Sequence, residues 1–413
     1  MRRIALSVAL AAILLDSSVF AQEILSLEEA LDRAGVESNL PPSSQSTNPR
    51  VYGPLAEEEA ARAAIAQARL RPNPELTFEA ENIAGTGAFS GLQSSEYTLG
   101  FGQQIELGGK RSARIESAEA SARVAGARRE LTMAQLALTV RERYVQAVAA
   151  GQRASLAREI VERNRELARI ARALVEVGRE PPLRAMRAEA ALAEAEAALE
   201  TAEAEYLAAR QALAALWLAD GTAPQVFGTF PELAPALAPM DTSLPLHLRL
   251  AGARADFAEA EVSRERSLGV PDPTVMAGGR RFEDSNEQAF IVGITIPLPF
   301  SNRNQGNIAA AEAQARAAQA DEAIAEADYR LEFERARTLY LAAERRVETL
   351  AGASLPQAEE ALRLVEIGYR NGRFPLIEVL AAAQARDAIR ENLIQAEETR
   401  SLLAARLIWL TAE

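Results

Sequence analysis

The fold is decided between residues 97 and 111, which read YTLGFGQQIELGGKR. As far as Leu107, apolar residues alternate with polar or small ones, and this period of two predicts a strand with one apolar and one polar face. The apolar face carries Tyr97, Leu99, Phe101, Ile105 and Leu107, and the opposite face carries Gly100, Gly102, Gln104 and Glu106. Beyond Gly108-Gly109, which permits a strand-to-helix turn, an Ala-, Glu- and Arg-rich stretch without proline runs from about Arg111 to Val177 and predicts one long helix.

Three further segments have the character of strands, namely residues 75–81, 274–282 and 290–298. In the first, Leu76, Phe78 and Ala80 face one way, and Glu75, Thr77, Glu79 and Glu81 face the other. In the last, Phe290, Val292, Ile294, Ile296 and Leu298 share a face. The middle segment alternates poorly, and we expect its Arg280 and Arg281 near a membrane interface. An apolar outside and a polar inside are what a lipid-embedded β-barrel requires, and strands of ~9–11 residues span a bilayer when tilted.

Four strands cannot close such a barrel, because single-chain membrane barrels begin at about eight strands and open edges are unsatisfied in lipid. Beyond the N-terminal leader, the sequence has no segment apolar enough for a transmembrane helix. The sequence therefore predicts that several copies of the chain assemble, without fixing how many.

A second long helix is predicted from about Gly306 to Asn371, with a possible kink at Pro356. A helix of ~65 residues extends roughly 100 Å, which no globular core spans, so neighbouring helices must support it as in a coiled coil. Taken alone, such helices are typical of cytoskeletal or adaptor coiled coils, but the leader and the strands argue against that interpretation.

The chain contains an internal repeat. Each half carries a short helix (near 54–70 and 246–268), two strands, a long helix, a Gly/Pro break and another helix. Equivalent residues lie 192 to 194 positions apart: Gly178 and Gly372, Pro181 and Pro375, Trp217 and Trp409. We expect an N-terminal segment and linker at 22–53, a first repeat at 54–219, a connecting segment at 220–245 and a second repeat at 246–413.

The N-terminus has the pattern of a secretory signal peptide at residues 1–21. Arg2 and Arg3 precede an apolar run from Ile4 to Leu15, and Val19-Phe20-Ala21 predicts cleavage after Ala21. The alternative is an uncleaved anchor, but the run is shorter than the ~20 residues that a span needs.

The composition argues against several kinds of partner and chemical activity. The net charge of −13 argues against nucleic acid as a partner, which needs a basic surface. The chain has no Cys and one histidine, His247, which we expect to be structural or exposed, so neither a dedicated soft-metal site nor a cofactor is predicted. The segment Gly108-Gly109-Lys110-Arg111 lacks the spacing of a phosphate-binding loop, and the abundant glutamates are spaced as solvated helix faces. We expect no enzyme activity.

This order of elements resembles the TolC family of outer-membrane efflux proteins over roughly residues 25 to 411, and most closely its heavy-metal (cobalt–zinc–cadmium) resistance branch. The resemblance lies in the duplicated order and in four segments: LSLEEA at 25–30, LGGKR at 107–111, IPLPF at 296–300 and GYRNGRFPLIEVL at 368–380. No single motif is diagnostic.

The resemblance implies a mainly α protein with membrane β-structure. Three protomers would each give four strands to a shared 12-stranded barrel in outer-membrane lipid, and long helical hairpins would form a barrel through the periplasm. The helix breaks would be the tips that meet a periplasmic adaptor, which links to an inner-membrane pump. The tip residues so implied are Gly178, Pro181, Pro182, Gly372, Arg373, Phe374 and Pro375.

The family carries acidic residues just past the second tip, and Glu378 stands at one such position. One turn later stands Ala381, and the equivalent place in the first half holds Arg184, which departs from the pattern. The hypothesis is that Glu378 lines the entrance and that Arg184 or Tyr369 helps to hold adjacent tips shut. The alternative is that Glu378 is a solvated residue of a helix's first turn.

Two other functions remain open. A protein-secretion (type I) outer-membrane duct would have a similar sequence. A periplasmic coiled-coil adaptor would also have a signal peptide and long hairpins, but adaptors carry one hairpin flanked by small β-domains, whereas two hairpins and two strand pairs are predicted here. The sequence leaves open whether the cargo is a metal ion, a drug or a protein.

Overall fold

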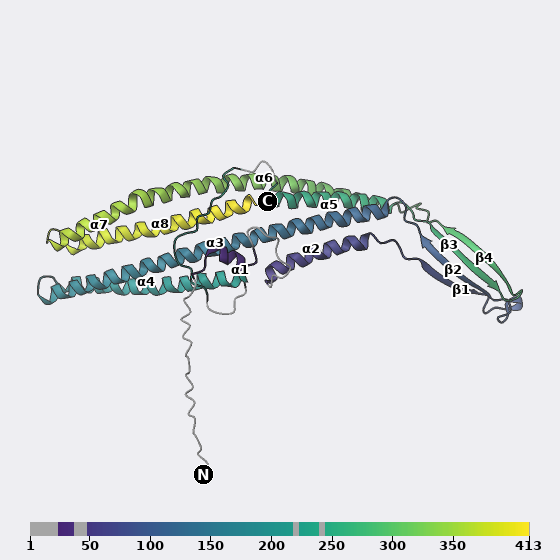
Figure 1. The fold of residues 1–413 in the computed structure, drawn as a ribbon, viewed down its shortest axis with the longest axis horizontal. Coiled ribbons are helices and arrows are strands. Elements are labelled where there is room, and N and C mark those ends of the chain that lie inside the picture. The colour runs from purple at the N-terminus through teal and green to yellow at the C-terminus, as the bar shows by residue number, and fades with distance from the viewer. Residues whose placement is uncertain (1–23, 37–47, 218–222, 239–243, 413) are drawn as a thin grey trace, which may run out of the picture.

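A computed structural model describes residues 24–36, 48–217, 223–238 and 244–412. The expected signal peptide, and most of the linker that follows it, lie outside these residues. The molecule is elongated, with a four-stranded sheet at one end and two long helical hairpins that reach to the other (Figure 1). Among the helices in these stretches, none combines the length and hydrophobicity that crossing a bilayer requires.

The first half of the chain comprises α1 (Leu27–Arg33), α2 (Pro49–Ala68), β1 (Glu75–Glu81), β2 (Glu96–Gln104), α3 (Lys110–Glu176) and α4 (Pro182–Ala214). The second comprises α5 (Leu246–Leu268), β3 (Thr274–Phe282), β4 (Glu287–Thr295), α6 (Gln305–Thr349), α7 (Leu355–Arg370) and α8 (Leu376–Leu410). From α2 onward the first half has the same order of elements as the second, where α6 and α7 together take the place of α3. Short 3-10 turns lie at Gly87–Phe89 and Ala215–Trp217.

The sheet is antiparallel throughout, in the order β1-β2-β3-β4. Strands β1 and β3 have the predicted bounds, but β2 ends at Gln104 and not at Leu107. Ile105 still donates its N–H to Pro273 O at 2.9 Å, but Pro273 has no N–H to continue the ladder. Strand β4 runs from Glu287 to Thr295, so the predicted range of 290–298 was displaced. The alternation continues beyond Thr295, but Pro297 and Pro299 cannot donate to a neighbouring strand.

The second long helix is not continuous. A π-helical turn at Leu350–Ser354 separates α6 from α7, and Pro356 lies in the first turn of α7. The Pro356 ring would meet the carbonyl four residues earlier, at Gly352, and its nitrogen cannot donate there. The π turn, with its wider hydrogen-bond spacing, absorbs this conflict.

The short helices continue the lines of the long ones. Asn48 caps α2 by accepting from Arg50 N, and its amide donates to Leu216 O at 3.0 Å, at the end of α4. Leu246 N, at the start of α5, donates to Ala412 O at 3.1 Å, just past α8. Figure 1 shows α5 extending from the end of α8 toward the sheet. Paired lines of helix therefore run from the sheet to the tips.

The apolar core is divided along the helices. A central cluster packs the middle of α3 against α1, α4 and the connecting segment, with Val140, Leu213 and Val226 fully buried. A second cluster joins α3, α6 and the end of α8, and a third lies near the tips. Many members are alanines, which let the helices approach closely. The described part of the connecting segment packs against the middle of the helices, where Tyr206 donates its hydroxyl to Val226 O at 2.8 Å.

Candidate functional site at the helical tips

The first tip is the turn between α3 and α4. Gly178 adopts a left-handed conformation with φ +70°. Its N–H donates to Val175 O at 3.0 Å, and the Arg179 N–H donates to Leu174 O at 2.9 Å. This is a Schellman ending, in which a left-handed glycine closes the last turn of the helix. Pro181 then caps α4 and Pro182 occupies its first turn, where proline costs no hydrogen bond.

The second tip repeats this geometry between α7 and α8. Gly372 has φ +69°, its N–H donates to Tyr369 O at 2.9 Å, and the Arg373 N–H donates to Gly368 O at 2.8 Å. Pro375 precedes the first residue of α8. Both helix breaks therefore lie where the Gly and Pro residues predict them, and both turns share the same pattern of backbone bonds.

Phe374 distinguishes the second tip from the first. Its ring lies against the backbone of Gly368, so that a Cβ on Gly368 would meet ring atom Cδ2 at 2.1 Å. Phe374 nevertheless remains 46% exposed. The chain thus holds an aromatic ring at the end of the molecule in a fixed orientation, which sequence periodicity does not predict.

The charged residues expected at the entrance fall into two groups. Arg184 is bound to Glu180 at 2.8 Å within the first tip. Tyr369 packs against the apolar cluster near the tips. Burial raises the pKa of its hydroxyl, the negative charge of Glu180 raises this pKa further, and the positive charge of Arg184 lowers it. Arg184, Glu180 and Tyr369 thus lie together. Glu378 is exposed in the first turn of α8, and no residue of the described chain pairs with its carboxylate.

Sequence reasoning missed Glu180. Its spacing of four residues from Arg184 across a proline pair gives no helical signal, because the pairing spans a turn rather than one helix face. The tips also expose apolar side chains, which are uncommon in such number on a solvated surface. They are Val177, Leu183, Met186, Phe374 and Ile377.

Ion pairs tie the two hairpins together above the tips. Arg153 on α3 binds Glu391 at 2.9 Å and Glu398 at 2.7 Å on α8. Further along, Arg163 pairs with Asp387 and Glu159 pairs with Arg390, again between α3 and α8. We call these contacts the α3–α8 ladder. Burial lowers the pKa of Arg153, but the hydrogen bonds that it donates to both glutamates outweigh this effect, and the pKa is raised.

The junction between sheet and helices is pinned by a second set of charges. Gly108 and Gly109 are both left-handed, with φ +67° and +74°, as expected for the turn. Lys110 binds Asp272 at 2.6 Å, and Asp272 also accepts from Leu107 N at 2.9 Å and Gln104 Nε2 at 3.0 Å. Burial alone would raise the pKa of Asp272, but the bonds from Lys110 and the backbone outweigh it and lower the pKa.

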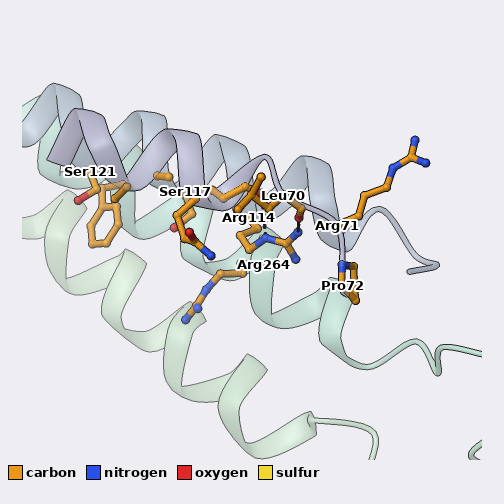
Figure 2. Close-up of a pocket in the computed structure, with 12 residues that line it drawn as sticks. Leu70, Arg71, Pro72, Arg114, Ser117, Ser121 and Arg264 are labelled. Atoms are coloured by element: carbon orange, nitrogen blue, oxygen red, sulfur yellow. Dashed lines mark hydrogen bonds between the residues drawn. The ribbon is translucent and has the colours of Figure 1, made fainter. Parts of the chain in front are cut away.

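A hollow of about 600 Å³ lies beside this junction, between α2, α3 and α5 (Figure 2). Arg114, Ser117 and Arg264, which line it, make bonds within the chain. Arg114 points along the end of α2 and donates to Leu70 O at 2.8 Å and to Ala68 O at 3.0 Å. Arg264 pairs with Glu261 and Glu265. Nothing in its lining indicates a ligand.

No group of three or more metal-ligating side chains is found in the described part of the chain. His247 packs edge-on against Trp409, with ring centroids 4.1 Å apart. Burial lowers its pKa, as does Arg406, whereas Glu332 raises it. His247 therefore lies against the core beside the end of α8.

Comparison with known proteins identifies the family to which this architecture belongs. The model of the "Outer membrane efflux protein" family matches residues 40–217 and 246–412. The cobalt-zinc-cadmium resistance protein CzcC of Cupriavidus metallidurans is 33% identical over 331 residues, covering 77% of this chain and 76% of that protein. The nickel-cobalt-cadmium resistance protein NccC of Alcaligenes xylosoxydans is 33% identical over 274 residues, covering 66% of this chain but only 62% of NccC.

The fold is also that of solved channels. The Campylobacter jejuni CmeC outer membrane channel superposes with a TM-score of 0.77 over 93% of this chain and 85% of its own, at 14% identity. With a family model that covers both halves of the chain, and with the sheet and hairpins of such channels, this protein belongs to the outer membrane efflux protein family.

Proposed function

We propose that this protein is the outer-membrane channel of a tripartite efflux system, a passive duct through which substrates leave the cell. The observation that carries the proposal is the two-faced sheet at the end of helical hairpins ~100 Å long. One face is bare and apolar, and its residue Phe290 is 98% exposed. A solvated sheet does not leave such a face uncovered, whereas one embedded in lipid requires it.

The edges of the sheet support a homotrimer. Neither β1 nor β4 pairs with a further strand among the described residues, and open edges are unsatisfied in a membrane. Three copies would join β4 of one protomer to β1 of the next and supply 12 strands, within the range of known membrane barrels. The repeated order of elements supports an internal duplication.

The polar face of the sheet would line the interior of this barrel. By strand register it carries five glutamates against one arginine, Arg280, which is itself bound to Glu81 and Glu96 at 2.9 Å. The glutamates are Glu75, Glu79, Glu81, Glu96 and Glu287. The same face also carries glycines, including Gly100 and Gly278, which add no side chain to it. An acidic, open lumen admits cations without a specific site.

The tips would meet the periplasmic adaptor, which links the channel to an inner-membrane pump. The rigid turns at Gly178, Pro181 and Pro182 and at Gly372, Arg373, Phe374 and Pro375 present exposed apolar side chains of the kind that protein interfaces bury. At the entrance, Glu378 would line the opening, and the group of Arg184, Glu180 and Tyr369 would hold neighbouring tips together.

The cargo we favour is divalent heavy-metal cations. The support is that two relatives, CzcC and NccC, are named as metal-resistance proteins, together with the acidic face of the sheet. Energy and selectivity would come from the pump, so the channel itself would catalyse no reaction. Membership of the outer membrane efflux family leaves no support for the periplasmic adaptor interpretation, and protein secretion becomes an outcome of the test.

The test is growth of a deletion strain, complemented with wild-type protein or with an empty vector, on divalent metals, dyes, detergents and antibiotics. We expect complementation to restore resistance to the metals cobalt, zinc, nickel or cadmium, and not to dyes, detergents or antibiotics. Restoration of resistance to apolar drugs would overturn the metal assignment. Restored protein secretion without any resistance would replace efflux by the secretion function.

A further inference from the structure

The apolar face of the sheet is graded from the helices to the hairpin loops. Strand register places Leu76, Phe101, Ala277 and Val292 in one row across the sheet and Phe78, Leu99, Gly279 and Phe290 in the next. The row nearest the loops holds Ala80, Tyr97, Arg281 and Gln288. Polar side chains therefore appear on this face at the loop end, as they do where a membrane protein meets the interface.

At this end the apolar face is hollowed. A depression of about 360 Å³ is lined by Phe78, Tyr97, Leu99, Arg281 and Phe290, with Gly279 among its floor residues. A Cβ on Gly279 would meet nothing within 4 Å, so the space above it is open. Phe78 and Tyr97 stack side by side at 6.3 Å and form one wall. Phe290, which is almost fully exposed, stands on the other side of Gly279.

The guanidinium of Arg281 stands at the loop end of this hollow. Its Nε donates to Glu283 at 2.9 Å and its Nη2 donates to Asn286 at 3.0 Å. A guanidinium has five N–H donors, so several remain free for another acceptor. Arg281 is half-exposed, and it lies on the apolar face, whereas its neighbour Arg280 lies on the polar face and is bound to glutamates.

We propose that this hollow binds a phosphorylated, acylated glycolipid of the outer leaflet of the outer membrane. An acyl chain would lie over Gly279 between the aromatic side chains, and a headgroup phosphate would accept hydrogen bonds from Arg281. Arg281 pairs with Glu283 and keeps further N–H donors, and a phosphate is an acceptor that the planar fork of arginine fits well.

The identification rests on the proposed function, because the loop end of the sheet faces the outer leaflet only if the helices extend into the periplasm. The loop end lies at the opposite end of the molecule from the helical tips (Figure 1). A glycerophospholipid of the inner leaflet would meet the other end of the sheet, near Arg303, which donates to Pro299 O.

The experiment is to purify the full chain from outer membranes in mild detergent and to measure bound lipid per mole of protein by mass spectrometry. Arg281→Gln removes the headgroup contact, and Gly279→Leu fills the hollow without a backbone clash. We expect Arg281→Gln to retain about tenfold less phosphorylated glycolipid than wild type, since hydrogen bonds to charged groups contribute on this scale. Gly279→Leu should also retain less, because its side chain takes the space of the acyl chain. Arg281→Lys is expected to retain more than Arg281→Gln, and Arg303→Gln as much as wild type.

Heat-modifiable migration of every variant shows whether it is folded, so Arg281→Gln still tests the proposal if Gly279→Leu misassembles. The proposal would be overturned if wild type and folded Arg281→Gln retained equal amounts of glycolipid. It would also be overturned if the lipid lost on replacing Arg281 were a glycerophospholipid. Failure of the proposed function would give a different result from failure of the lipid proposal. The wild-type protein would then be absent from outer membranes or would not be heat-modifiable.

Discussion

The ring of Phe374 rests directly on the backbone of Gly368, leaving no space for even one methyl group on that residue. The contact closes the turn at the second tip, beside the backbone bonds of the turn and the bond from Asn371 Nδ2 to Ile367 O at 2.8 Å. The first tip has the same backbone turn but no such ring. The second hairpin therefore depends on a glycine that is buried for a steric reason, in addition to the glycine that needs a left-handed conformation.

Gly368→Ala is expected to displace Phe374 and loosen the second tip. Overpacking of this kind costs about 1–3 kcal/mol, so amide exchange in residues 368–376 should quicken about tenfold or more. Gly306→Ala, at a helical position with nothing within 4 Å, is the control and should exchange as wild type. In the Phe374→Ala background, Gly368→Ala should have little further effect on exchange. Additive effects of the two substitutions would contradict the contact between Phe374 and Gly368.

Asp272→Asn is expected to weaken the junction between sheet and helices, because Lys110 would be left largely buried without its counter-charge. Leaving such a group poorly satisfied costs about 1–3 kcal/mol, measured as a lower thermal midpoint of the purified protein. Asp256→Asn, an exposed aspartate without a partner among the described residues, should match wild type. No difference between the two variants would remove the structural role of the pair.

The same pair predicts a pH dependence. The pKa of Asp272 in the folded protein lies below its ordinary value of 3.8, so its contribution is fully present above that value. It is lost as pH falls through the lower, folded-state pKa. The midpoint difference between wild type and Asp272→Asn should therefore be constant near neutral pH and vanish only in acid. A difference that disappears near pH 6 would assign the effect to another group.

These residues show how far the sequence could predict the structure. Strands β1 and β3 were predicted to the residue, because period-two alternation or turn residues mark both of their ends. The ends of β2 and β4 were not, because side chains keep alternating after prolines have stopped the backbone ladder. The π turn before Pro356 and the pairs Lys110–Asp272 and Arg184–Glu180 depend on local hydrogen bonding and on the approach of distant segments, which pattern alone does not contain.

Glu378→Gln tests the entrance. If the carboxylate lines the opening, its removal should lower the cation preference of single channels in planar bilayers, because an unpaired acid attracts cations to a narrow mouth. The effect should shrink at high salt, which screens the charge. Glu200→Gln, an exposed acid on α4 far from the tips, serves as the matched control. Conductance, selectivity and gating identical to wild type would leave Glu378 as a solvated residue of a helix's first turn.

Arg153→Met is expected to loosen the α3–α8 ladder, since one guanidinium there serves two glutamates. Partly exposed ion pairs contribute at most about 1 kcal/mol each, so the thermal midpoint should fall by a few degrees and the loss should shrink with added salt. Arg165→Met, which breaks more exposed pairs with Glu162 and Glu196, should have a smaller effect. Equal effects would show that the ladder is not a specific link between the hairpins.

Adjacent glycines in β3 give the sharpest test of the sheet. A Cβ on Gly278 would lie 2.5 Å from Leu99 O and 2.9 Å from the Gly100 Cα, and both are backbone atoms of β2 that cannot move without breaking the ladder. A Cβ on Gly279 points to the opposite face and meets nothing. Gly278→Ala should therefore cost about 1–3 kcal/mol or more and reduce the heat-modifiable form in outer membranes. Gly279→Ala should stay within about 0.5 kcal/mol of wild type. Equal assembly of the two variants would mean that β2 and β3 pair in another register. Because a shift of one residue exchanges the two faces of a strand, that result would also overturn the assignment of the acidic face to the lumen.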